Sequence, residues 1–285
     1  MRAHLLVLCG LVLGGCAWEP GQGFTVVDPS VRIVYEALAN RATTEGYQRL
    51  SSDYQLRVDS ASMRLSGIEL IAVSQGSGAG SSFDPANPPA GYSLCHNGHC
   101  HRSDGALIPY AQVAAEMGGG GGSTTVVTLS AAQPANLLVP EVQPMTCAPS
   151  CSLPQTEVTQ GRWTFQSLKI TGTVRDSRVP ARFPGERTFE LSIQPSLDIE
   201  KELPEMLLTS TMELPSNRTE PPDAKLRLGL TLTAALFDRM DWSGLKYDAD
   251  GVLRFTDMRD EGELVALIAR LNQLTPTAEV TRGDP

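Results

Sequence analysis

The chain has 285 residues, of which 41% are hydrophobic and 19% charged, and its formal net charge is −9. This composition is typical of a globular protein, and the length suffices for one large domain or two small domains with a hydrophobic core. Because the excess of acidic residues repels polyanions and no basic cluster offsets it, we do not expect nucleic acid as a partner.

Residues 1–15 have the organisation of a secretory signal peptide. A short basic start with Arg2 and His4 precedes an apolar stretch from Leu5 to Val12, and small residues lead to Cys16. The apolar stretch is too short for a transmembrane helix, which needs about 20 apolar residues. We therefore expect residues 1–15 to be removed during export.

The segment Leu13-Gly14-Gly15-Cys16 resembles the lipobox of bacterial lipoproteins, in which a signal peptidase cuts before the cysteine. The resemblance covers only the leader, and it implies that Cys16 carries lipid and anchors the chain in a membrane of the bacterial cell envelope. More than one acyl chain is needed for a stable anchor. Ala17 stands where an inner-membrane retention signal has Asp, which favours the outer membrane. Residues 16–23 then form a lipidated tether.

Residues 24–285 are predicted to form a β-rich domain. Apolar and polar residues alternate along many segments, which is the period of half-buried strands. The predicted strands are, in chain order, 31–35, 54–58, 63–72, 124–129, 163–174, 189–193, 206–214, 226–232 and 252–255. The strands at 163–174 and 189–193 are expected to be antiparallel neighbours, and a change of phase predicts a bulge at Ser66 and Gly67. For residues 31–40 a short helix is the alternative.

Helices and loops complete the predicted domain. Leu264, Leu267, Ile268 and Leu271 have helical spacing, which predicts an amphipathic helix over residues 260–274. Shorter helical segments are expected at residues 109–117 and 234–240. A long Gly-rich and Cys-rich loop is predicted at residues 74–122, and a second loop at residues 134–160. The fold class is therefore mainly β, a β-sandwich of antiparallel sheets with a C-terminal amphipathic helix.

Four cysteines remain after the leader residue Cys9 and the lipid site Cys16 are set aside. In the oxidising envelope an even number predicts two disulfides, with three connectivities. Pairing within each cluster closes tiny loops worth about 2 kcal/mol each, whereas bridging the clusters closes loops of roughly 50 residues worth about 4 kcal/mol. Stability favours the long bridges and proximity the short ones, so the pairing stays open among Cys95, Cys100, Cys147 and Cys151.

The segment Cys95-His96-Asn97-Gly98-His99-Cys100-His101 holds every histidine outside the leader. Neutral imidazole and thiolate are ligands that suit zinc and copper. With free thiols, Cys95 and Cys100 would join His96, His99 and His101 as ligands; when oxidised, the cysteines would lock the loop and leave three imidazoles. The spacing matches no specific metal motif, so a loop that is only stapled by a disulfide is the alternative.

No catalytic motif is found, and we expect a protein that is not an enzyme. Asp248-Ala249-Asp250-Gly251 resembles the start of a calcium loop, but Arg259 stands where the bidentate Glu should be, so a turn is predicted. The sequence thus predicts a lipid-anchored binding or interaction module with a candidate zinc or copper site in its Cys/His loop. The alternative is a structural or partner-binding lipoprotein. An enzyme would need a second polar group near the cluster, such as Asp104, Tyr110 or Glu116.

Overall fold

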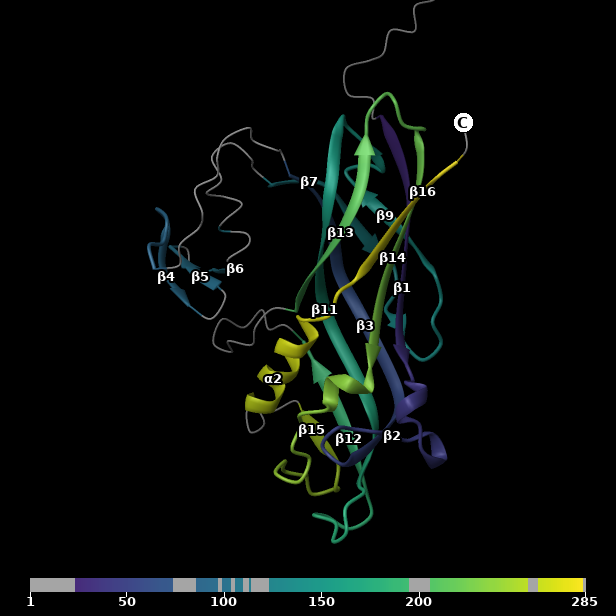
Figure 1. Cartoon of the computed structure of the whole chain (residues 1–285), viewed down its shortest axis with the longest axis vertical. Helices are drawn as coiled ribbons and strands as arrows, with labels where there is room; N and C mark the ends of the chain where they lie inside the picture. Colours follow the sequence, from purple (N-terminus) through teal and green to yellow (C-terminus); the bar gives the residue numbers. More distant parts are fainter. Residues whose placement is uncertain are drawn as a thin grey trace, which may run out of the picture.

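The computed structural model describes residues 24–73, 86–96, 99–103, 106–109, 113, 123–194, 206–255 and 261–283. In these residues the fold is mainly β, with a 13-stranded sheet, a separate three-stranded sheet and one α-helix, which confirms the predicted fold class (Figure 1). The predicted signal peptide, lipobox and tether lie outside the described residues. No helix in the described part of the chain is both long and apolar enough to span a bilayer.

The strands of the large sheet differ widely in length. They are β1 (Thr25–Glu36), β2 (Gln48–Arg49), β3 (Tyr54–Val73), β7 (Ser123–Ala131), β8 (Ala135–Asn136), β9 (Gln143–Ala148), β10 (Ser152–Leu153), β11 (Thr156–Asp176), β12 (Glu186–Ile193), β13 (Leu207–Ser216), β14 (Asp223–Thr233), β15 (Leu253–Phe255) and β16 (Thr277–Arg282). The small sheet contains β4 (Tyr92–His96), β5 (His99–Arg102) and β6 (Leu107–Pro109). The helix is α2 (Glu261–Leu271), and the 3₁₀ turns are η1 (Ala39–Arg41), η2 (Thr44–Gly46) and η3 (Ala234–Phe237).

The two longest strands, β3 and β11, pair antiparallel along almost their whole length and run along the long axis of the molecule (Figure 1). The main path through the sheet is β15-β12-β11-β3-β7-β9-β1-β14-β16. The predicted antiparallel pairing of β11 with β12 is confirmed. However, β1 pairs with β14 in parallel, as does β12 with β15, so the large sheet is mixed rather than antiparallel throughout. Alternation reports which face is buried and carries no information about strand direction.

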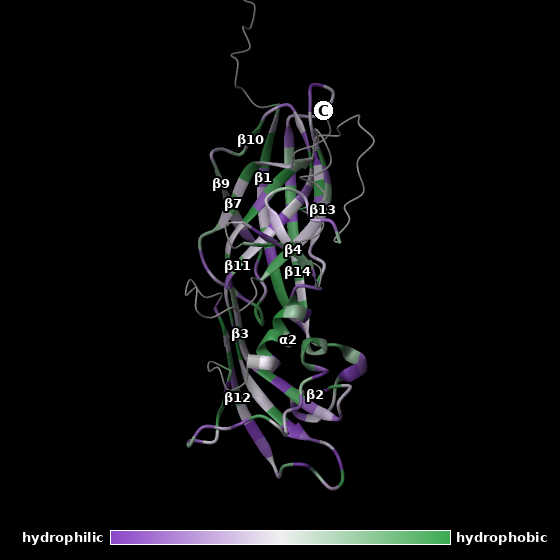
Figure 2. Ribbon diagram, turned by 90° about the vertical axis from the view of Figure 1, so that its left-hand side faces the viewer, coloured by the Kyte–Doolittle hydropathy of each residue, from purple (hydrophilic) through white to green (hydrophobic). Residues whose placement is uncertain are grey.

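The main hydrophobic core includes buried residues of β1, β14, β3 and β11. Every second residue of β14 is buried, which places its leucines in this core. Figure 2 shows the corresponding alternation of hydrophobic and hydrophilic colour along the strands. Trp163 is fully buried and its Nε1 donates to Ser210 Oγ at 3.1 Å, so this large core side chain also has its polar atom satisfied.

Several local predictions can be compared directly with the structure. Gly67 pairs with Thr164 and Leu65 with Phe165, so Ser66 has no partner opposite, which confirms the predicted bulge. The helical alternative for residues 31–40 is wrong, because β1 continues through Glu36 and pairs with β14 from Val26 to its end.

The C-terminal helix is confirmed, and its four predicted apolar residues are buried in the main core. The two predicted loops are partly wrong. Residues 134–160 contain β8, β9, β10 and the start of β11, and residues 74–122 contain the small sheet. These short strands have two to six residues, too few to display a period. The predicted helix at 109–117 starts too early, because Pro109 is the last residue of β6. Of residues 110–117 only Val113 is described, and it is helical.

Candidate metal centre

The small sheet brings the histidines together through a tight hairpin. Strands β4 and β5 are antiparallel, with Cys95 opposite Cys100 and His96 opposite His99, and the two residues between the strands are Asn97 and Gly98. Asn-Gly is the pair most strongly preferred in two-residue hairpin connections, because both positions favour a positive φ. Asn97-Gly98 is therefore a local sequence signal for this hairpin. The small sheet lies beside the long strands (Figure 1).

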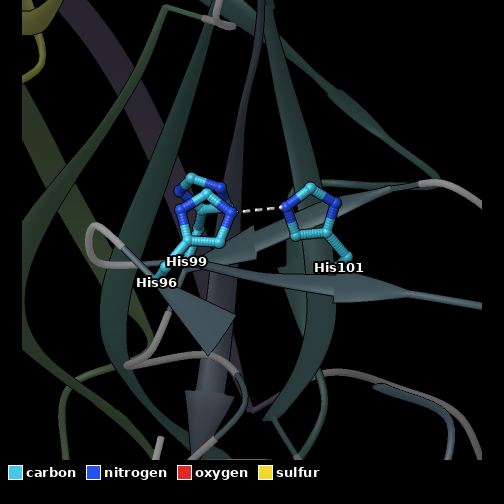
Figure 3. Close-up of side chains that lie close together, drawn as sticks. All are labelled: His96, His99 and His101. Atoms are coloured by element: carbon cyan, nitrogen blue, oxygen red, sulfur yellow. Dashed lines mark hydrogen bonds between the residues drawn. The ribbon is translucent and has the colours of Figure 1, made fainter. Parts of the chain in front are cut away.

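Strand alternation sorts the side chains of the hairpin onto two faces. Residues directly opposite each other share a face, and successive residues point to opposite faces. His96 and His99 therefore share one face, and Cys95 and Cys100 share the other. His101 lies two residues beyond His99 on β5, so all three imidazoles project from the same face, as Figure 3 shows.

The cysteine face is closed by a disulfide and a small core. Cys95 is joined to Cys100, and Cys147 to Cys151, so the structure has the two short-loop bridges and the predicted pair of disulfides is confirmed. Cys100 is fully buried and forms a cluster with Ile108 and Val113 that is separate from the main core. Because neither Cys95 nor Cys100 is a free thiolate, the Cys2His2 set is not offered here and the cysteines lock the loop instead.

The histidine face presents three imidazoles at short range. One ligand nitrogen from each of His96, His99 and His101 can be chosen so that all lie within 4.8 Å of one another. His96 Nε2 and His101 Nε2 are 3.0 Å apart, the contact dashed in Figure 3. The ring centroids are separated by 4.7 Å for His96 and His99, 5.1 Å for His96 and His101, and 5.3 Å for His99 and His101. All three rings keep contact with solvent.

Two leucines lie next to His101 on the histidine face. Leu94 and Leu107 lie on either side of His101 in the register of the sheet, and they are 53% and 54% exposed. Among the described residues, no carboxylate or thiolate joins the three histidines. The donor set is therefore three nitrogens, which suits zinc or copper and leaves at least one coordination position for water or another small ligand.

The other sequence candidates have structural roles where they are described. The guanidinium of Arg254 contacts Asp248 at 2.9 Å and Asp250 at 2.8 Å, and it holds the pKa of the Asp250 carboxyl below its usual value. These acids belong to a turn, as predicted, and are paired with an arginine. Asp104, Tyr110 and Glu116 lie outside the described residues.

Comparisons of the chain with protein-family models, with curated proteins and with solved structures find no match.

Proposed function

We propose that this chain is a lipid-anchored protein of the bacterial cell envelope whose β-rich domain is a binding module for a zinc or copper ion. His96, His99 and His101 would hold the ion, and lipid on Cys16 would hold the protein at a membrane, the outer membrane in preference to the inner. The observation that carries the metal site is the placing of the three ligand nitrogens within 4.8 Å on one face of a disulfide-closed hairpin.

The spacing of the imidazoles supports coordination without a large rearrangement. Nitrogen ligands lie about 2.0–2.1 Å from a zinc ion, so two of them lie about 3.3 Å apart at the tetrahedral angle. His96 Nε2 and His101 Nε2, which form a hydrogen bond at 3.0 Å, would move apart by only a few tenths of an ångström to reach that separation. His99 has to approach by rotation of its ring, which a partly exposed side chain can do. The backbone of the hairpin stays fixed, because the disulfide on the opposite face holds both strands.

A second candidate function is a structural or partner-binding lipoprotein whose hairpin binds no metal. The exposure of Leu94 and Leu107 favours this candidate, since large apolar side chains that are more than half exposed on one sheet face are typical of contact surfaces. In that case a protein partner would cover the leucines.

Metal analysis of the mature protein, purified without chelator, separates the two candidates. We expect near-stoichiometric zinc or copper, and loss of that metal in the triple variant His96→Ala, His99→Ala, His101→Ala. The control variant Leu94→Ser should keep the metal, because it changes the same face without removing a ligand. Metal at background level in the unaltered protein would contradict the proposed site and favour the partner-binding candidate.

Intact-mass measurement of the native product tests the proposed anchor. We expect a chain that begins at Cys16 and carries acyl mass, and the variant Cys16→Ser should lose both the cleavage and the lipid. An uncut leader, or a trimmed chain without acyl mass, would contradict the lipoprotein proposal. This outcome would leave the metal site untouched, since the two proposals rest on different residues.

A further inference from the structure

We propose that residues 138–142 form a second membrane contact, so that the β-rich domain lies with its long side against the bilayer that anchors Cys16. This inference rests on the lipid anchor proposed above and adds the orientation of the domain to it. It follows from the apolar side chains of the segment, from the way its two ends are held, and from the length of chain between the lipid and the first strand.

The connection between β8 and β9 is apolar and exposed. Its sequence over residues 138–142 is Leu138-Val139-Pro140-Glu141-Val142. Leu138, Val139 and Val142 are 37%, 59% and 63% exposed. Single exposed apolar residues are ordinary on protein surfaces, whereas a group of them marks a contact with a membrane or with another protein. Residues 138–142, the apolar loop, are therefore a candidate contact surface.

Both ends of the apolar loop are held to β1. The Tyr35 N–H donates to the Leu137 carbonyl oxygen at 2.9 Å, and Gln143 pairs with Val31. Leu137 is also fully buried, and its N–H donates to the Ala61 carbonyl oxygen at 2.9 Å. In Figure 1 the teal connection that leads into β9 projects beyond β1. Because the base of the loop is fixed, its exposed side chains need little ordering when they bind a surface.

The charged neighbours of the apolar loop suit lipid headgroups. Arg32 is exposed and lies on β1 between Val31 and Tyr35, the two residues that hold the loop. Glu141 is also exposed, so its carboxylate has to remain at the level of the headgroups. Charged side chains that stay at the headgroups while apolar neighbours enter the acyl boundary are typical of interfacial segments. Shallow insertion of the loop is therefore expected.

The length of chain before β1 favours a lipid surface as the occupant. Residues 17–23 separate Cys16 from Phe24, so the lipid lies at most about 28 Å from the start of the domain. The apolar loop is held to β1 at Val31, about 20 Å along the strand from Thr25. A bilayer that anchors Cys16 is thus always within reach of the loop at a high effective concentration, whereas a protein partner has to diffuse to it.

The experiment couples the unlipidated mature chain to vesicles through Cys16. The other four cysteines of that chain are joined in two disulfides, so Cys16 provides the thiol that reacts with a maleimide headgroup. The vesicles contain phosphatidylethanolamine and phosphatidylglycerol, with or without bromine on their acyl chains, and Val139→Trp places a fluorophore in the loop. We expect its emission to shift to shorter wavelength and roughly half or more of it to be lost to bromine, since interfacial apolar groups lie about 5–10 Å into the boundary.

Leu94→Trp is the matched control. Leu94 is 53% exposed, close to the exposure of Val139, and its small sheet lies on the opposite side of the long strands from β1 (Figure 1). The emission that this variant adds should not be reduced by bromine. Adding Leu138→Ser and Val142→Ser to Val139→Trp should lower the loss of emission, because fewer apolar side chains then hold the loop in the boundary.

The outcomes separate this inference from the proposed anchor. Loss of emission in neither variant, or an equal loss in both, would overturn the lipid contact of the apolar loop. A shift of Val139→Trp that grows with protein concentration without vesicles would overturn it in favour of self-association. Because the coupling supplies the anchor, these results leave the lipoprotein proposal intact. A native product without acyl mass would instead overturn the anchor, and the orientation with it.

Discussion

Breaking the disulfide behind the histidines should weaken metal binding even though no ligand is removed. The change is the double variant Cys95→Ala, Cys100→Ala. Alanine is preferred to serine because Cys100 is fully buried, and a hydroxyl without a partner would add a desolvation cost of its own. We expect the metal-free hairpin to open more often, and the metal to bind only after it has closed again.

The size of the effect follows from the length of the loop. The cysteines are five residues apart, and a disulfide that closes a loop of about six residues is worth about 2 kcal/mol in the chain-entropy model. The small sheet has few other contacts to replace this term, because its separate core consists of Cys100, Ile108 and Val113 with a few partly buried neighbours. If the free energy of metal binding falls by the whole of these about 2 kcal/mol, the dissociation constant of the metal rises about 30-fold.

A titration of Zn²⁺ against a chromophoric chelator measures this change without a reducible ion. Cys147→Ala, Cys151→Ala is a matched control, since that disulfide joins cysteines four residues apart and Cys147 packs against the main core. We expect the control to leave the dissociation constant within about twofold. An unchanged constant in the Cys95/Cys100 variant, or an equal change in both variants, would refute the argument that the disulfide preorganises the imidazoles.

Two further predictions concern the large sheet. Gly172→Ala should lower the free energy of unfolding in urea by about 1–3 kcal/mol, because a Cβ there would overlap the Arg57 carbonyl oxygen and the Phe189 ring. A stability equal to that of the unaltered protein would show that the strands can move apart. The Arg178 side chain donates hydrogen bonds to the Asp176 carboxyl and lowers the pKa of this carboxyl from 3.8 to about 2. The carboxylate therefore stabilises the fold fully above pH 3.8, and this stabilisation disappears as the pH falls toward about 2. Asp176→Asn should lower the melting temperature at neutral pH and approach the unaltered protein in acid; parallel curves of melting temperature against pH would contradict this.

The long strands could be predicted from the sequence because each is long enough to show a period. In β14 the leucines at 226, 228, 230 and 232 are all buried, and the residues between them are exposed or partly exposed. The bulge at Ser66 was predictable for the same reason, since an extra residue reverses the phase of the pattern. Both features depend on local sequence alone.

The order and direction of the strands could not be predicted in the same way. The parallel pairing of β1 with β14 joins segments about 200 residues apart, and the residues of neither strand indicate which strand it pairs with. The short strands were missed for a different reason. Proline is depleted in strands, so Pro144 in β9 and Pro109 in β6 do not indicate strands at these positions. Both strands are also too short to show an alternation of apolar and polar residues.

The candidate site was predictable in its members and only partly in its arrangement. All three histidines were named from their concentration in seven residues, but the cysteine pairing stayed open. Reading Asn97-Gly98 as a two-residue hairpin connection would have placed Cys95 opposite Cys100, and hence the histidines on the reverse face. The missing step was the register of the hairpin, which a two-residue connection fixes.

The histidine face and the large sheet depend on separate cores, and this separation decides how a negative result is interpreted. Cys100, Ile108 and Val113 form a cluster of their own, distinct from the main core, which includes residues of β1, β14, β3 and β11. Unfolding of the large sheet should therefore report the main core, and metal affinity the small one. Loss of metal from a histidine variant with an unchanged melting temperature then assigns the loss to the imidazoles. A parallel fall of both would show that the small sheet supports the main core, contrary to the pattern of burial.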